Sequence, residues 1–252
     1  MLLLSPLSIF VLASRSLRRS DALAQRARLH HARIPHYSKN VESTKQQIKY
    51  KQALECPLAR LVVASGPAGT GKTFMAVAHG IRALQEKEYD KIILTRPTVT
   101  VESESLGFLP GDVNGKMLPF ILPVCDVLQT GNKKSALADV QAMLASGIVE
   151  VVPLAFVRGR TFRNAFIICD EMQNSTPTQM KAVLTRLGQG SKIVVTGDPG
   201  QQDLDIDTKS GFCDLVSRIS NEEPSEKINF IQLDRNDVQR DVFVKDILRM
   251  YD

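Results

Sequence analysis

The chain lacks any apolar run approaching the roughly 20 residues of a membrane-spanning helix, so we expect no membrane span. Internal repeats and low-complexity tracts are also lacking, which argues against a repeat architecture. What is present is a chain of 252 residues, 43% of them hydrophobic. That length and content suffice for the core of one α/β domain, with or without a tail.

Closely spaced cysteines are missing too. No CxxC pair and no Cys/His cluster has the spacing of metal ligands. We therefore expect unpaired thiols in a reducing compartment. Cys169 belongs to an apolar strand pattern and is predicted to lie in the core. The four cysteines are Cys56, Cys125, Cys169 and Cys213.

A general excess of charge is absent from most of the chain, although the net charge is +5. Residues 1–41 hold seven basic residues and one acid, so the remainder carries 25 basic and 26 acidic residues, a net of −1. Bulk charge therefore does not indicate nucleic-acid binding, and only a local basic patch would do so.

Residues 1–41 differ in composition from the rest. A mostly apolar stretch, residues 2–13, precedes a segment rich in Arg, His, Ser and Ala and poor in acid. This pattern is typical of a targeting leader for a plastid or mitochondrion. The alternatives are a disordered basic tail or a wrongly assigned start. In either case the protein would be cytoplasmic. We predict a leader over 1–41 and one domain over 42–252.

Short strands rich in Ile and Val alternate with helical segments along the body, which predicts a mostly parallel sheet with helices on both faces. We expect the strands to be apolar on both faces. They are predicted at Arg60–Ser65, Lys91–Thr95, Ile148–Pro153, Ala165–Cys169, Ser191–Thr196 and Lys227–Leu233. Helices are predicted at Ser43–Leu54, Lys72–Lys87, Pro119–Gln129, Lys133–Ser146, Pro177–Leu187, Gly211–Ile219 and Gln239–Met250.

The clearest helical pattern begins at Pro177. Thr176 suits the N-cap, Pro177 suits the first turn, and Gly188 suits the end. An apolar stripe at helical spacing runs along it through Met180, Val183, Leu184 and Leu187.

A glycine-rich motif connects the first predicted strand to a helix. It matches GxxxxGK[ST] between a strand and a helix, the context that a phosphate-binding P-loop requires. We expect its backbone N–H groups to surround the phosphates of ATP, Lys72 to neutralise them, and the Thr73 hydroxyl to bind Mg²⁺. The motif consists of Gly66, Pro67, Ala68, Gly69, Thr70, Gly71, Lys72 and Thr73.

Two adjacent acids end the strand NAFIIC, in the order Asp170 and Glu171. Ligands of parallel α/β sheets bind beyond the carboxyl ends of the strands, where the P-loop also lies. We expect Asp170 to complete the Mg²⁺ shell through water and Glu171 to polarise the attacking water. A third strand runs into GDPGQ, which places the amide of Gln201 where it can sense the γ-phosphate, although Gly, Asp and Pro are also typical of an ordinary turn. Gln173 is the alternative sensor.

Several ordered motifs together resemble the PhoH family of P-loop ATPases, relatives of the superfamily-one RNA and DNA helicases. They extend over about residues 44–252. They are TxxQxxY from Thr44, GPAGTGKT, TRP from Thr95, LGFLPGD from Leu106, RGRT from Arg158, TGDPGQQDL from Thr196 and DVQR ending at Arg240. The last motif departs from the family's DVVR pattern, and Met172 replaces the usual Ala.

This resemblance implies a single RecA-like domain and roles for further residues. It implies that Gln47 reads the adenine edge, although its helical position alone predicts a surface residue. Arg240 is a candidate to act on the transferring phosphate. Candidate contacts to phosphate or to single-stranded RNA are Arg96, Arg158 and Arg160, with Lys133 and Lys134 as the runner-up pair for RNA. Salt bridges at loop ends are the alternative for the arginines.

One RecA-like domain can build a composite ATP site only by meeting another subunit, so we expect a homo-oligomeric ring, which the resemblance suggests is a hexamer. The predicted activity is Mg²⁺-dependent ATP hydrolysis coupled to RNA remodelling. An ATP-dependent switch that binds a protein is the main alternative. A small-molecule kinase is disfavoured by Glu171 and Gln201.

Overall fold

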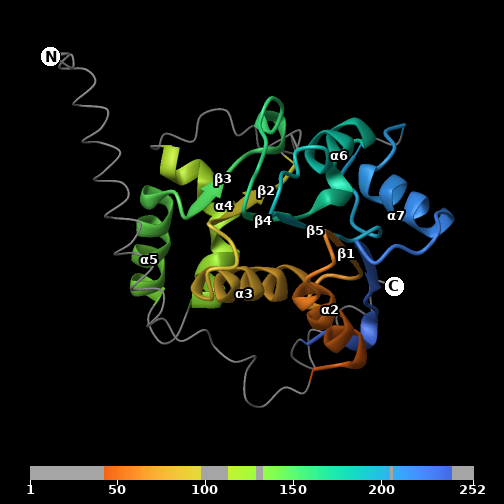
Figure 1. Cartoon of the computed structure of the whole chain (residues 1–252), viewed down its shortest axis with the longest axis horizontal. Coiled ribbons are helices and arrows are strands. Elements are labelled where there is room, and N and C mark those ends of the chain that lie inside the picture. The colour runs from red at the N-terminus through yellow and green to blue at the C-terminus, as the bar shows by residue number, and fades with distance from the viewer. Residues whose placement is uncertain (1–42, 98–112, 129–132, 205–206, 240–252) are drawn as a thin grey trace, which may run out of the picture.

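The computed structural model describes residues 43–97, 113–128, 133–204 and 207–239, with a six-stranded parallel sheet at its centre (Figure 1). The strand order is β3-β2-β4-β5-β1-β6. The strands are β1 (Leu61–Ser65), β2 (Lys91–Thr95), β3 (Val149–Val151), β4 (Ala165–Cys169), β5 (Lys192–Gly197) and β6 (Ile228–Gln232). All six predicted strands are therefore confirmed, with bounds that move by at most two residues.

Only the interior of the sheet is apolar on both faces. Strands β4 and β5 are buried along their whole length, whereas β6 is partly or fully exposed throughout. The prediction that the strands are apolar on both faces was wrong for the edge strands β3 and β6, which carry the polar residues Glu150, Asn229 and Gln232 and are only partly buried.

Helices cover both faces, as predicted. On one face lie α2 (Lys45–Glu55), α3 (Lys72–Gln85), α4 (Val113–Leu128) and α5 (Lys133–Ser146). On the other lie α6 (Pro177–Leu184) and α7 (Gly211–Asn221), with the short 3-10 helices η1 (Leu154–Phe156) and η2 (Met172–Asn174). The alternation of strand side chains builds both cores: Phe166 and Ile168 pack beneath α3, and Ile167 and Cys169 face α6. Burial also raises the pKa of the Cys169 thiol, which suits the predicted core position.

Helix α6 begins as predicted but ends early. Thr176 forms a capping box with Gln179, and Pro177 occupies the first turn. The helix stops at Leu184 rather than at Gly188. The reason is tertiary: the Phe162 N–H donates to the carbonyl of Arg186 at 2.9 Å, and the Gly188 N–H donates to the Phe162 carbonyl at 2.7 Å. These bonds pair residues 186–188 with the segment around Phe162 and end the helix.

Helix α4 starts earlier than predicted, at Val113, so Pro119 lies inside the helix instead of at its first turn. Residues 240–250 of the predicted helix Gln239–Met250 fall outside the described residues, as does the LGFLPGD motif, and Gln239 itself is not helical. In the described part of the chain, no helix is long and apolar enough to cross a membrane.

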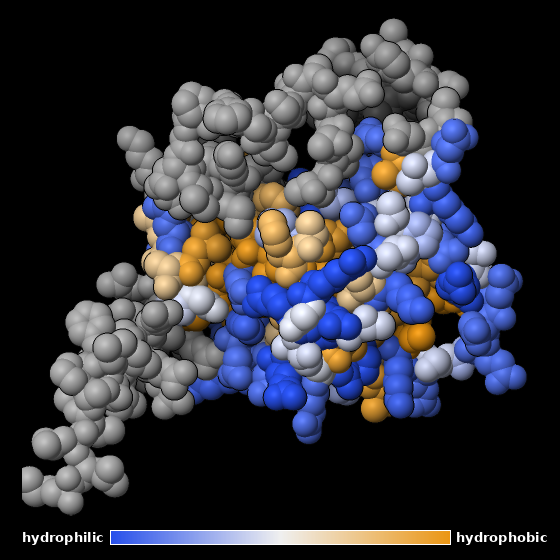
Figure 2. Space-filling view, turned by 90° about the horizontal axis from the view of Figure 1, so that it is seen from above, coloured by the Kyte–Doolittle hydropathy of each residue, from blue (hydrophilic) through white to orange (hydrophobic). Residues whose placement is uncertain are grey.

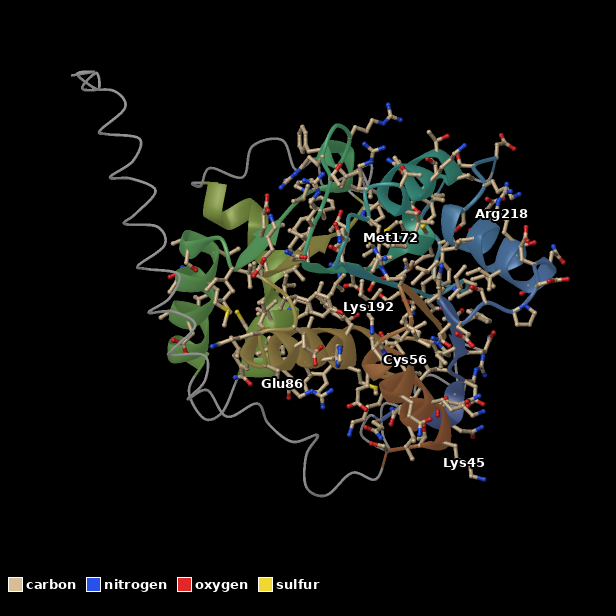
Figure 3. All side chains as sticks on the ribbon, in the orientation of Figure 1. Lys45, Cys56, Glu86, Met172, Lys192 and Arg218 are labelled. Carbon is tan, nitrogen blue, oxygen red and sulfur yellow. The ribbon has the colours of Figure 1, made fainter. Side chains whose placement is uncertain are left out.

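Lys192, on β5, is a buried cation that joins the sheet to α2. Its Nζ donates to the carbonyls of Leu54 at 2.6 Å and Cys56 at 2.8 Å, at the C-terminal end of α2 (Figure 3). The last carbonyls of a helix lack intrahelical donors and carry partial negative charge, so they stabilise this ammonium. The helix that carries Gln47 is thereby held against the sheet.

Candidate nucleotide-binding site

The P-loop connects β1 to α3 at the carboxyl edge of the sheet. Gly66 has φ +151°, and a Cβ there would lie 2.5 Å from the Leu233 carbonyl oxygen, so a larger residue cannot replace it without shifting the backbone. Gly71, the N-cap of α3, has φ +85° in the left-handed region. The unpaired N–H groups at the start of α3 are suited to bind phosphate oxygens.

Lys72 lies folded against the P-loop. Its Nζ donates to the carbonyls of Gly66 at 2.6 Å and Pro67 at 2.8 Å. Burial lowers the pKa of Lys72, while the nearby carboxylates Asp198, Glu171 and Asp170 act to raise it. Bound phosphate oxygens would replace the two carbonyls as acceptors. Asp198, which the sequence indicated only as a turn residue, is therefore part of the electrostatic environment of Lys72.

Thr73 and Asp170 are brought together, although they lie 97 residues apart. The Thr73 hydroxyl donates to Asp170 Oδ1 at 2.7 Å. Thr196 lies on β5, the strand between β4 and β1, and its hydroxyl donates to the same oxygen at 2.6 Å. Sequence reasoning missed Thr196, because only the strand order places its hydroxyl beside Asp170.

This donor set fits Mg²⁺. Hydroxyl and carboxylate oxygens are ligands that Mg²⁺ prefers, and the ion usually completes its shell with waters and substrate phosphates. Among the described residues, no group of three or more His, Cys, Asp or Glu side chains could hold a metal ion by itself. A cation here would thus be held by Thr73 and Asp170 together with the nucleotide.

Arg96 contacts the same acids. Its guanidinium donates to Asp170 Oδ2 at 2.7 Å and lies 3.7 Å from Glu171 Oε1. It follows β2, which pairs with β4, so the two strand ends meet at one edge. Arg96 was predicted, with Arg158 and Arg160, to contact phosphate or RNA. In the structure it belongs to the acid site.

Glu171 adopts a strained backbone conformation. Its φ is +54°, in the left-handed region that residues with a side chain seldom adopt. Its side chain is 43% exposed, and its Oε2 accepts from Gln173 Nε2 at 2.7 Å. Left-handed backbone at a non-glycine residue is common at functional sites. The turn holds one acid facing solvent directly beside the buried Asp170.

Gln173 links the acid turn to the loop after β5. Besides binding Glu171, its Oε1 accepts from the Asp198 N–H at 3.1 Å, and the side chain is buried. Gln201 is exposed, with its N–H bonded to the Asp198 carbonyl. Gln173, the alternative sensor, is therefore the glutamine in contact with Glu171.

Gln47 is fully buried, so its prediction as a surface residue was wrong. Its Nε2 donates to the carbonyls of Thr70 at 3.0 Å and Asp237 at 3.1 Å. Its Oε1 accepts from the Thr44 N–H at 3.1 Å and from Gln239 Nε2 at 2.8 Å. The amide therefore uses both its donors and accepts two bonds while it holds the P-loop, and the adenine contact stays a prediction.

Two more carboxylate contacts complete this network. The Thr44 hydroxyl donates to Asp237 Oδ1, and the Asp234 N–H donates to Asp237 Oδ2 at 2.7 Å. Sequence reasoning missed Asp237. The only signal was its place in the DVQR motif.

The remaining predicted RNA contacts that the structure describes have other surroundings than Arg96. Arg160 donates to Glu150 Oε1 at 2.5 Å and its guanidinium stacks 5.0 Å from the Phe162 ring centre. Arg158 is exposed. Arg240 and the side chains of Lys133 and Lys134 lie outside the described residues.

The family comparison agrees with these motifs. The family model described as PhoH-like protein matches residues 41–252. This chain belongs to the PhoH-like protein family. The PhoH-like protein of Bacillus subtilis (strain 168) is 44% identical over 192 residues, which cover 76% of this chain and 58% of the relative.

Other relatives lie at similar distances. The PhoH-like protein of Synechocystis is 46% identical over 74% of this chain and 55% of the relative, and Protein PhoH of Escherichia coli (strain K12) is 39% identical over 81% and 56%. The chain thus spans a little over half the length of these curated relatives.

Among solved structures, Pif1 helicase from Candida albicans aligns with 84% of this chain and 44% of its own, at a TM-score of 0.40 and 16% identity. The P-loop and the parallel sheet are already evident from the strand order and the site. Family membership and fold together identify a nucleotide-binding P-loop domain of the RecA-like type.

Proposed function

We propose that this protein binds ATP with Mg²⁺, hydrolyses it, and couples the reaction to single-stranded RNA. The observation that supports hydrolysis best is the bond of 2.7 Å between Thr73 and Asp170, with Glu171 beside it. A nucleotide hydrolase needs a hydroxyl at the end of the P-loop and an acid pair close to each other, and here the acid pair follows β4.

The position of each residue in the site determines the role that we propose for it. The N–H groups of the P-loop and Lys72 bind phosphate oxygens. Thr73 and Asp170 hold the cation, which would neutralise charge developing on the phosphates. Glu171 accepts the proton of the attacking water, and Gln173 orients its carboxylate through the bond of 2.7 Å.

The exposure of Glu171 favours hydrolysis over transfer to a small molecule. An acid at the solvent-facing side of the site suits activation of water, while a kinase of this fold must exclude water from the transferring phosphate. An ATP-driven switch that binds a protein would use the same site. RNA distinguishes the two, because only the RNA-coupled enzyme changes its turnover with RNA.

The test is phosphate release by the purified 252-residue chain, with ATP and Mg²⁺, with and without single-stranded RNA. Mg²⁺-dependent release that rises with RNA supports the whole proposal. Release that neither RNA nor single-stranded DNA alters at low salt supports the switch. Absence of any release contradicts hydrolysis.

Assembly into a ring, with a hexamer as the expected size, is part of the same proposal. Arg240 would then act on the ATP of a neighbouring subunit and raise turnover by roughly 10³–10⁵. Mixing Arg240→Ala with Glu171→Gln subunits tests this, since some mixed interfaces regain both groups. A mixture that co-assembles and stays inactive contradicts action in trans.

Import into an organelle, directed by residues 1–41, is proposed as well.

A further inference from the structure

Two segments on the α6 side of the sheet, residues 152–164 and 175–191, contain no acid. Between residues 151 and 197 the only carboxylates are Asp170 and Glu171, both in the nucleotide site, whereas six residues are basic. Arg160 is neutralised by Glu150, and Lys192 is buried under α2. The exposed charges that residues 151–197 contribute outside the nucleotide site are therefore all positive, although the chain beyond residue 41 carries a net of −1.

Tertiary pairing brings the arginines of the two segments together. Phe162 pairs with Leu187 in a parallel bridge, and Arg186 Nη1 lies 3.5 Å from the Arg160 carbonyl. A Cβ on Gly188 would lie 2.7 Å from Arg163 Cγ, so the Arg163 stem packs on the segment that follows α6. Arg158 and Arg163 are exposed, and Arg186 is half-buried.

An exposed aromatic side chain precedes Arg158 in the chain. Phe156 ends η1, two residues before Arg158, and is 71% exposed. Its neighbours Leu154 and Val157 are buried and anchor the loop, and Gly159, with φ +77°, completes a turn closed by the Arg160 N–H and the Val157 carbonyl at 3.3 Å. The ring is thus presented to solvent by a loop held at both ends. Figure 2 looks onto the molecule from the α6 side and shows strongly hydrophilic side chains beside hydrophobic ones.

We propose that Phe156, Arg158, Arg163 and Arg186, the arginine face, bind single-stranded RNA, with Phe156 stacking on a base and the arginines contacting phosphates. This rests on the proposed coupling to RNA and names its site. Positive groups beside an exposed ring are the elements that proteins use to bind single strands without reading sequence. A stable interface with a folded protein would instead need several apolar side chains at its core, and within the described residues 151–197 Phe156 is the large hydrophobic side chain that is exposed.

The face is joined to the nucleotide site in two ways. The Leu154 N–H donates to the Arg96 carbonyl at 3.4 Å, and Arg96 contacts Asp170 and Glu171. Helix α6 follows η2, which contains Gln173, directly after Glu171. An RNA strand bound to this face would therefore act on both Asp170 and Glu171, and we expect it to raise the rate of hydrolysis.

The test measures anisotropy of a fluorescein-labelled oligouridine about 20 nucleotides long over a range of KCl concentrations. Removing two phosphate contacts with Arg158→Ala/Arg163→Ala should reduce the magnitude of the log–log salt slope by about 1.4. Phe156→Ala should weaken binding about 5- to 150-fold and leave the slope unchanged. Both variants should reduce the ratio of RNA-stimulated to basal turnover.

The matched control is Lys49→Ala/Lys51→Ala, which removes two exposed charges from α2, and it should bind as the parent does. If the parent binds oligouridine and Arg158→Ala/Arg163→Ala retains its slope, the arginine face is wrong while RNA coupling stands. If the parent binds neither oligouridine nor single-stranded DNA, both fail. If the variants dissociate an oligomer and keep the parent's RNA affinity, the face is a subunit interface and the proposal is overturned.

Discussion

The two sides of the P-loop are held in different ways. On one side, the clamp side, Gln47 and Asp237 form a buried network with Thr70 and Thr44. On the other, the acid side, Thr73, Thr196 and Arg96 converge on Asp170. The clamp side uses an amide that is completely buried, whereas the acid side is charged and opens toward solvent at Glu171.

The difference indicates what each side does. A buried amide that makes four hydrogen bonds is costly to disturb, because each broken bond leaves a polar group unsatisfied. The partly exposed Arg96 and Glu171 can exchange partners at smaller cost, since water replaces a lost contact. We therefore interpret the clamp side as the part that fixes the loop, and the acid side as the part that exchanges its protein contacts for ligand.

The largest expected effect is on chemistry at the acid side. Glu171→Gln should slow ATP turnover by roughly 10²–10⁴ with little change in nucleotide affinity, because the amide cannot accept the proton of water. Phosphate release and binding of a fluorescent nucleotide measure the two quantities. Glu150→Gln, a carboxylate paired with Lys91 and Arg160 away from the site, is the control. Turnover near that of the parent would remove Glu171 from the mechanism.

Breaking the clamp side should appear first as lost stability. Gln47→Leu leaves the carbonyls of Thr70 and Asp237 without these donors, so the free energy of unfolding should fall by about 3 kcal/mol. Urea unfolding measures it. Gln52→Leu changes an exposed glutamine on the same helix and should have little effect. Equal midpoints for the two variants would show that the clamp does not hold the loop.

Lys72 tests ligand exchange. Lys72→Ala should weaken nucleotide binding roughly 10- to 150-fold, the range expected for loss of a charged hydrogen bond. Nucleotide titration of the variant beside Lys45→Ala, on the exposed surface of α2, measures it. Binding as tight as in the control would contradict a phosphate contact.

The smallest expected effect concerns Arg96, which neutralises Asp170 in this conformation. If the cation must displace its guanidinium, Arg96→Met should lower the Mg²⁺ concentration for half-maximal nucleotide binding about fivefold, as for a partly exposed ion pair of about 1 kcal/mol. A Mg²⁺ titration measures it, with Arg218→Met, which breaks a surface ion pair on α7, as control. An unchanged or higher requirement would contradict displacement.

Much of the molecule could be predicted because its signals are local. The P-loop, the acid pair after β4 and the cap of α6 each depend on neighbouring residues, and their spacing alone indicates a strand end or a helix start. The strands followed from short apolar runs, and edge exposure was missed because a run does not reveal its place in the sheet.

The tertiary structure decided how distant segments meet. Arg96 and Asp170 lie 74 residues apart and share an edge because β2 pairs with β4. Gln47 and Asp237 lie 190 residues apart, and α6 ends where Phe162 pairs with Leu187. The sequence by itself determined the chemistry available, namely a phosphate loop, two acids and a set of arginines, because a short motif fixes its own backbone. Which arginine faces the acids, and which face solvent together, depends on strand order and packing between segments that no local pattern records.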